Sequence, residues 1–81
     1  MTVRVLYFAA LADRAGRREE VVELVPGLDV AGLWRRLTTI HPRLAEVTPP
    51  PMAACDLVRA DGSRLLDGVR EVAFLPPFSG G

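Results

Sequence analysis

The chain has 81 residues, and ten arginines balance ten acidic residues to give a formal net charge of zero. This length supports one hydrophobic core, and 49% hydrophobic with 25% charged residues is the composition of a folded domain. A neutral chain has no overall field that would attract nucleic acid or an anionic membrane, so neither is expected as a partner. We therefore expect a single domain over residues 1–81.

Few side chains in the sequence could carry chemistry. There is no lysine, which excludes a Schiff base or a side-chain isopeptide, and one histidine, one cysteine and two serines cannot form a convincing triad or metal cluster. We expect His41 to lie at a helix C-terminus and Cys55 to be a small core residue. The sequence thus predicts a non-enzyme with no metal site and no permanently bound cofactor.

The single cysteine also bears on the compartment, because a chain without an internal disulfide suits a reducing cytoplasm. Residues 4–12 loosely imitate a signal peptide, with an arginine, an apolar run and an alanine-rich segment. The apolar run is at the short limit for such a segment, and no stretch approaches the length of a membrane span. We expect a cytoplasmic protein.

In the first half of the chain, apolar and polar residues alternate over 2–8, which predicts a strand. Residues 9–15 are rich in helix formers and end at Gly16, which predicts a short helix, and 20–25 predicts a second strand. The clearest helix begins at Asp29 as its N-cap and ends near Pro42. Its expected core face carries apolar residues at helical spacing: Val30, Leu33, Trp34 and Leu37.

In the second half, residues 43–51 are expected to be an extended connection, stiffened by three consecutive prolines. Residues 52–60 contain a strand, turns follow at Asp61-Gly62 and Asp67-Gly68, and 71–75 is the last strand. Residues 76–81 begin with two prolines and have no helical or strand pattern, so they are expected to form an extended flexible C-terminal tail.

The order strand, short helix, strand, helix, strand, strand predicts an α+β domain of the β-grasp type. Its mixed sheet has about four to five strands, with one main helix and one or more short helices covering one face. The first strand pairs with both the second and the last. We expect this pairing to place the tail at a sheet edge, projecting from a rigid platform.

The tail ends in Gly80-Gly81, a pair that occurs by chance in about one chain in two hundred at average glycine usage. Residues without side chains can enter a narrow channel in a partner. The carboxylate of Gly81 would be a poor electrophile until ATP activated it as an acyl adenylate, after which a sulfur nucleophile could displace AMP. A fortuitous flexible end without function, or a chain trimmed at this point, is the alternative on spacing alone.

Four segments are informative when taken together: Val5-Leu6-Tyr7-Phe8-Ala9, Leu66-Asp67-Gly68, Glu71-Val72-Ala73-Phe74 and Pro76-Pro77-Phe78-Ser79-Gly80-Gly81. They resemble a known family, the small sulfur carrier subunits of molybdopterin synthase (MoaD) within the ubiquitin-like MoaD/ThiS superfamily. Most of the specificity lies in the ending, since the two glycines alone are common to ubiquitin-like carriers.

The resemblance implies that Gly81, preceded by Gly80, is adenylated by an E1-like partner of the MoeB type that uses ATP and magnesium. A sulfur donor such as a cysteine desulfurase or rhodanese then supplies the sulfur of a terminal thiocarboxylate. This carrier donates sulfur inside a MoaE-type large subunit to make molybdopterin for the molybdenum cofactor. Residues around the tail are the candidate partner contacts: Pro76, Pro77, Phe78, Ser79, Phe8 and Phe74, of which Phe74 is favoured as core.

The sequence leaves three alternative functions open, of which the first uses the same sulfur chemistry. A ubiquitin-like sulfur carrier could instead serve tRNA thiolation, thiamine synthesis or cysteine synthesis. A protein modifier conjugated through the carboxyl group of Gly81 is a different class, and a binding module with an inert tail is a third.

Overall fold

The computed structural model describes residues 1–77, so predictions that concern residues 78–81 lie outside the described part of the chain. The elements, in order, are β1 (Thr2–Tyr7), α1 (Ala10–Ala15), β2 (Glu19–Glu23), α2 (Val30–Ile40), the 3-10 helix η1 (Pro42–Glu46), β3 (Met52–Cys55), β4 (Val58–Ala60) and β5 (Glu71–Leu75).

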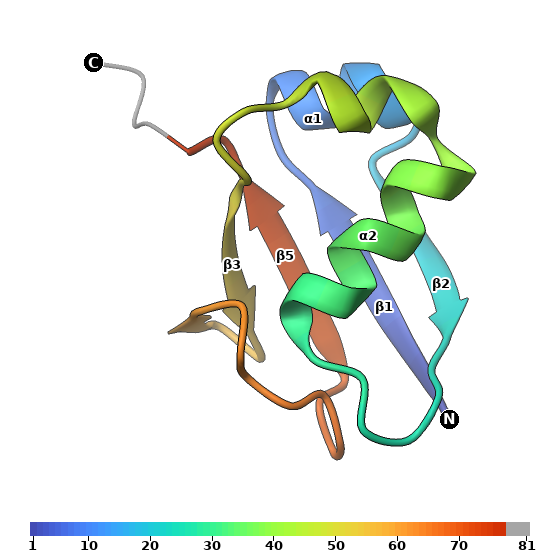
Figure 1. Ribbon diagram of the computed structural model, residues 1–81, viewed down its shortest axis with the longest axis vertical. Coiled ribbons are helices and arrows are strands. Elements are labelled where there is room, and N and C mark those ends of the chain that lie inside the picture. Colours follow the sequence, from blue (N-terminus) through green and yellow to red (C-terminus); the bar gives the residue numbers. More distant parts are fainter. Residues whose placement is uncertain (78–81) are drawn as a thin grey trace.

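The strands form one five-stranded sheet in the order β2-β1-β5-β3-β4 (Figure 1). The β1–β5 pair is parallel and the other pairs are antiparallel, so the predicted mixed β-grasp sheet is confirmed. The tail was expected at a sheet edge, and this expectation is wrong. It leaves instead from β5, the middle strand, because β3 pairs with the side of β5 that β1 leaves open.

The main helix α2 lies across one face of the sheet and supplies much of the core (Figure 1). Asp29 caps its first turn by accepting a hydrogen bond from the backbone N–H of Gly32 at 2.7 Å, as predicted. Leu33 and Leu37 are fully buried against strand residues such as Val5 and Val72, and each such burial contributes about 1.5–3 kcal/mol relative to exposure. Trp34, predicted as core, is only partly buried and packs against the core edge.

Two connections differ from the sequence prediction. The segment 43–51 was expected to be extended throughout, but η1 occupies its first half, because Pro42 at the first position suits the start of a new helical turn. Residues 52–60 form a hairpin of two strands, β3 and β4, joined by Asp56 and Leu57 at φ 48° and 71°. Two-residue turns with positive φ at both positions usually contain Asn or Gly, so the sequence Asp56-Leu57 gave no signal for a turn.

The carboxylate of Asp56 explains why this turn forms without glycine. Its Oδ1 accepts hydrogen bonds from the backbone N–H groups of Arg70 and Glu71, at 3.1 and 3.0 Å. These contacts tie the hairpin to the start of β5, which offsets the cost of the left-handed backbone.

A largely buried cluster of three polar side chains joins β1, β2 and the end of α2. One carboxylate oxygen of Glu20, Oε2, accepts a hydrogen bond from the Tyr7 hydroxyl at 2.5 Å and lies 2.7 Å from Nε2 of His41. His41 caps the C-terminal end of α2, as predicted. Its contact with the Glu20 carboxylate was not predicted from the sequence. Burial and the Glu20 hydrogen bond hold the pKa of the Tyr7 phenol far above its usual range.

Burial also acts to raise the pKa of the Glu20 carboxyl, but hydrogen bonds from Tyr7 and His41 outweigh it, so that the pKa is lowered. A carboxyl with a lowered folded-state pKa stabilises the fold above its unfolded pKa. This stabilisation disappears as the pH falls through the folded-state pKa.

Substituting Glu20→Gln is expected to lower the free energy of unfolding at pH 7 by about 1–3 kcal/mol, because both neighbours lose a charged acceptor. The difference from the parent protein should shrink as the pH falls below about 4.5, near the usual carboxyl pKa. Urea unfolding at several pH values measures both effects. As a control, substituting the exposed neighbour, Glu19→Gln, should change the free energy of unfolding by less than about 0.5 kcal/mol. A stability difference between Glu20→Gln and the parent protein that stays constant down to low pH would contradict the stabilising role of the Glu20 carboxylate.

Candidate functional site

The tail begins on a strand that is held on both sides. At its end, Phe74 is opposite Tyr7 of β1 and Leu75 is opposite Met52 of β3. The backbone N–H of Phe8 also donates to the carbonyl of Phe74 at 3.1 Å, so β1 and β5 remain hydrogen-bonded almost to the point where the tail begins. The residues that follow Leu75 therefore start from a fixed position and direction.

Pro76 and Pro77 are partly buried and line a small hollow of about 180 Å³ beside α1 and the segment after η1. The hollow's walls include Leu11 and Val47. An ion pair between Arg14 of α1 and Glu46 of η1 joins the two sides of this hollow. Because proline has a fixed φ, these two residues form a stiff base for the tail.

Four of the predicted reactive and contact residues lie outside the described part of the chain: Phe78, Ser79, Gly80 and Gly81. The structure describes only the first two residues of the tail, Pro76 and Pro77. The other two predicted contact residues differ in exposure. Phe8, just beyond β1, is 45% exposed and available to a partner, whereas Phe74 is 1% exposed and belongs to the core. The core interpretation favoured for Phe74 is confirmed.

An apolar surface adjoins the tail on the face of the sheet opposite α2. Strand alternation places Leu6, Ala73 and Ala54 side by side on this face, since Leu6 pairs with Ala73 and Ala73 with Ala54. Ala73 is buried yet is not part of the core cluster under α2. Leu75 and Met52 extend the same surface to the base of the tail. We call these five residues the outer apolar surface.

Charged groups border the outer apolar surface at the other end of the strands. Arg4 of β1 donates to Glu71 of β5 at 2.8 Å and lies 3.9 Å from Glu19 of β2. The sheet face is therefore apolar near the tail and ionic away from it. Such a border restricts how a partner can be oriented on this face.

Sequence reasoning missed two exposed apolar side chains at the β3–β4 hairpin. Leu57, in the turn, is 87% exposed, and Val58, the first residue of β4, is 68% exposed. No helical or strand period marks them, because one is in a tight turn and the other begins a strand of only three residues. Their exposure adds them to the candidate contact residues.

The two other reactive side chains are not at the surface. Cys55 is 3% exposed and pairs with Val58 and Val72 within the sheet, as expected for a core residue. Burial raises the pKa of its thiol, which lowers its reactivity. His41 is engaged with Glu20.

Residues 1–77 contain no group of three His, Cys, Asp or Glu side chains able to hold a metal ion. Within that same range, every helix is too short or too polar to cross a membrane.

Comparisons with known proteins identify the family. The sequence is 35% identical to the molybdopterin synthase sulfur carrier subunit of Chlamydomonas reinhardtii, over 100% of both chains. It is 34% identical to the human protein of the same name, over 98% of this chain and 93% of the human chain. The chain belongs to this family of sulfur carrier subunits. No family model matches it.

Solved structures agree on the fold of this MoaD-type chain. SAMP1 from Haloferax volcanii superposes with a TM-score of 0.85 at 25% identity, over 100% of both chains. A chain in the complex of subunits 1 and 2 of molybdopterin-converting factor from Helicobacter pylori gives 0.64 at 23% identity, again over 100% of both. These likenesses show a ubiquitin-like β-grasp fold.

Cys55 should react with a disulfide reagent about two orders of magnitude more slowly in the native protein than in urea, because its thiol is buried and its pKa raised. Since the chain has only one cysteine, thiol labelling followed by absorbance reports on this site alone. Equal rates in the native and unfolded protein would show that the thiol is accessible.

Proposed function

We propose that this chain carries sulfur on the carboxyl group of Gly81 as the small subunit of a molybdopterin synthase. The full-length identity of 35% to a protein of that name is the observation that carries the proposal. The fold supports it, because a tail that starts from the central strand of a rigid sheet is well placed to enter another protein.

The reaction takes place in three steps. The Gly81 carboxylate attacks the α-phosphorus of ATP, pyrophosphate leaves, and an acyl adenylate forms. The terminal sulfur of the donor's persulfide then attacks the carbonyl carbon and expels AMP, which gives an acyl disulfide. A thiol reduces this disulfide, and the thiocarboxylate is released while the thiol is oxidised to a disulfide with the donor. An E1-like partner of the MoeB type supplies ATP, magnesium and the catalytic groups, and a cysteine desulfurase or rhodanese supplies the sulfur.

This division of labour agrees with the side chains that the carrier offers. Cys55 is buried and His41 is paired with a carboxylate, so neither is positioned to act at the tail. The carrier itself is thus a non-catalytic subunit and holds no permanent cofactor. We place it in the cytoplasm, where its free thiol would stay reduced.

The sulfur acceptor is bound by a MoaE-type large subunit, into which the tail inserts. The Helicobacter pylori neighbour, found in a complex of subunits 1 and 2, supports a partner of this kind. The outer apolar surface and Phe8 provide the contact area beside the tail. Phe78, which follows the two prolines, is the proposed anchor at the mouth of the channel, with Ser79 and Gly80 inside it.

A second function in the same chain is conjugation to other proteins through Gly81. The observation that favours it is the similarity to SAMP1, a small archaeal modifier protein, at a TM-score of 0.85. The same acyl adenylate would serve, with a lysine amine of another protein as the final nucleophile. This chain has no lysine, so it cannot be extended into side-chain-linked polymers of itself.

Incubation with the E1-like enzyme, ATP and a sulfur donor should increase the intact mass of the chain by the exchange of one oxygen for one sulfur. Deleting Gly81 should abolish the exchange. The matched control Cys55→Ser should retain it, which separates a thiocarboxylate from a persulfide on the buried thiol. An unchanged mass with an active enzyme, or an exchange lost in Cys55→Ser, would overturn the carrier proposal.

The pathway is tested with the purified thiocarboxylate form. Mixed with a MoaE-type subunit and the pterin precursor, it should yield molybdopterin in a fluorescence assay for the oxidised pterin, while the carboxylate form yields none. Sulfur transfer only to tRNA, to a thiazole-forming enzyme or to a cysteine-forming enzyme would reassign the pathway. A ladder of conjugated proteins without pterin product would instead support the modifier function.

A further inference from the structure

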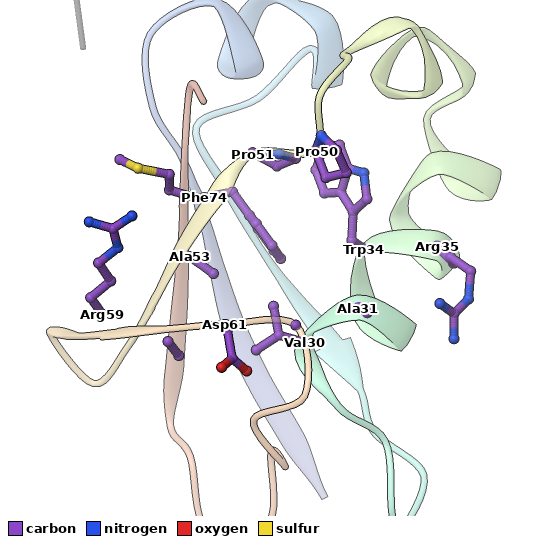
Figure 2. A pocket seen from close by; sticks show the side chains of 13 residues that line it. Val30, Ala31, Trp34, Arg35, Pro50, Pro51, Ala53, Arg59, Asp61 and Phe74 are labelled. Carbon is purple, nitrogen blue, oxygen red and sulfur yellow. The ribbon is translucent and has the colours of Figure 1, made fainter. Parts of the chain in front are cut away.

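A second hollow, of about 590 Å³, lies on the helix side of the sheet, between α2 and the β3–β4 hairpin (Figure 2). Its apolar lining comes from elements far apart in the sequence: Val30, Trp34, Pro50, Ala53, Ala60 and Phe74. We call it the hairpin groove. The outer apolar surface is on the opposite face of the sheet, and the two share only Met52 of β3.

Trp34 forms the exposed wall of the hairpin groove, and the buried ring of Phe74 lies behind it. The two rings are 5.1 Å apart between centroids and tilted by 48°. Pro50 lies beside Trp34 in Figure 2, whereas the guanidinium groups of Arg35 and Arg59 extend away from the groove. The space beside Trp34 therefore suits a bulky apolar side chain, and Trp34 stays only partly buried because the groove exposes it.

One acidic side chain, Asp61, stands at the end of the hairpin groove. Its Oδ1 accepts hydrogen bonds from the backbone N–H and the hydroxyl of Ser63, at 2.9 and 2.6 Å, and these bonds lower the pKa of the carboxyl. The groove thus combines an apolar interior with an exposed, ionised carboxylate that can pair with a cation.

The hairpin groove also reaches the base of the tail. Pro51 and Met52 contribute to its lining, and Met52 is paired with Leu75, the last residue before the two prolines. A protein that holds the tail is therefore within reach of the groove.

We propose that the hairpin groove docks a segment of a tail-binding partner, in which a bulky apolar residue is followed by a lysine or arginine. The apolar side chain packs against the exposed part of Trp34, and the cation pairs with Asp61. The inference rests on the proposed function in that the partner is one that receives the tail. Docking there would hold the partner on the helix side while the tail is inside it.

The test uses the full chain and a capped dipeptide, acetyl-Phe-Arg-amide, as the probe. Titration followed by amide and indole shifts should move the signals of groove residues, and the indole signal reports on one site because Trp34 is the only tryptophan. We expect saturable binding with a dissociation constant of about 1 mM. Acetyl-Ala-Arg-amide should not bind, and acetyl-Phe-Glu-amide should bind about threefold more weakly, the effect of one exposed ion pair.

Asp61→Asn supplies the matched variant, since asparagine keeps the acceptor for Ser63 and removes only the charge. It should bind the arginine and glutamate probes equally. The same change at an exposed aspartate outside the groove, Asp67→Asn, should leave the threefold preference intact. Equal binding of both probes by the parent chain, or shifts centred on the outer apolar surface, would overturn the proposal.

Two further readouts complete the test. Groove signals that shift with protein concentration alone would show that a second copy fills the groove, which also overturns the proposal. With the large subunit, Asp61→Asn should weaken binding about threefold while thiocarboxylate formation proceeds normally. Failure of thiocarboxylate formation with intact probe binding would remove the proposed function and leave the groove assignment standing.

Discussion

The parallel pairing of β1 with β5 is the constraint on which the rest of the structure depends. It brings the two ends of the described chain together in the middle of one sheet, with Val5 opposite Val72. Parallel neighbours cannot be joined by a tight turn, so everything between them forms a long crossover that carries α2 over one face. Together with the β3–β5 pairing, it surrounds the base of the tail with strands on both sides, which makes a short sheet a rigid support.

The two faces of that sheet serve different purposes. The face under α2 is filled by fully buried side chains such as Leu33 and Leu37, and it provides the cohesion of a small domain. The opposite face carries the outer apolar surface beside the tail and an Arg4–Glu71 ion pair farther away. An apolar surface that remains outside the core in an 81-residue protein is readily explained if another protein covers it.

The polar side chains that could have carried chemistry have structural partners instead. Glu20 binds Tyr7 and His41 together, and so joins the end of α2 to the strands β1 and β2. Cys55 is part of the core, and Asp56 holds a strained turn against the start of β5. A carrier benefits from this arrangement, because the Cys55 thiol and the His41 imidazole then do not compete for its transferable group.

Local signals determined much of this fold from the sequence alone. The Asp29 cap, the Gly16 helix end and the alternation in β1 act through neighbouring backbone groups, and the family resemblance was already present in the residues of the ending. Only the tertiary structure decided what depends on distant partners. The Asp56-Leu57 turn needs a backbone donor from β5. The exposure of Phe8 and the burial of Phe74 follow from strand register. The hairpin groove exists because Trp34 of α2 and Phe74 of β5, forty positions apart in the sequence, are in contact. Spacing along a chain cannot report such contacts, since they are set by how the sheet closes over its helix.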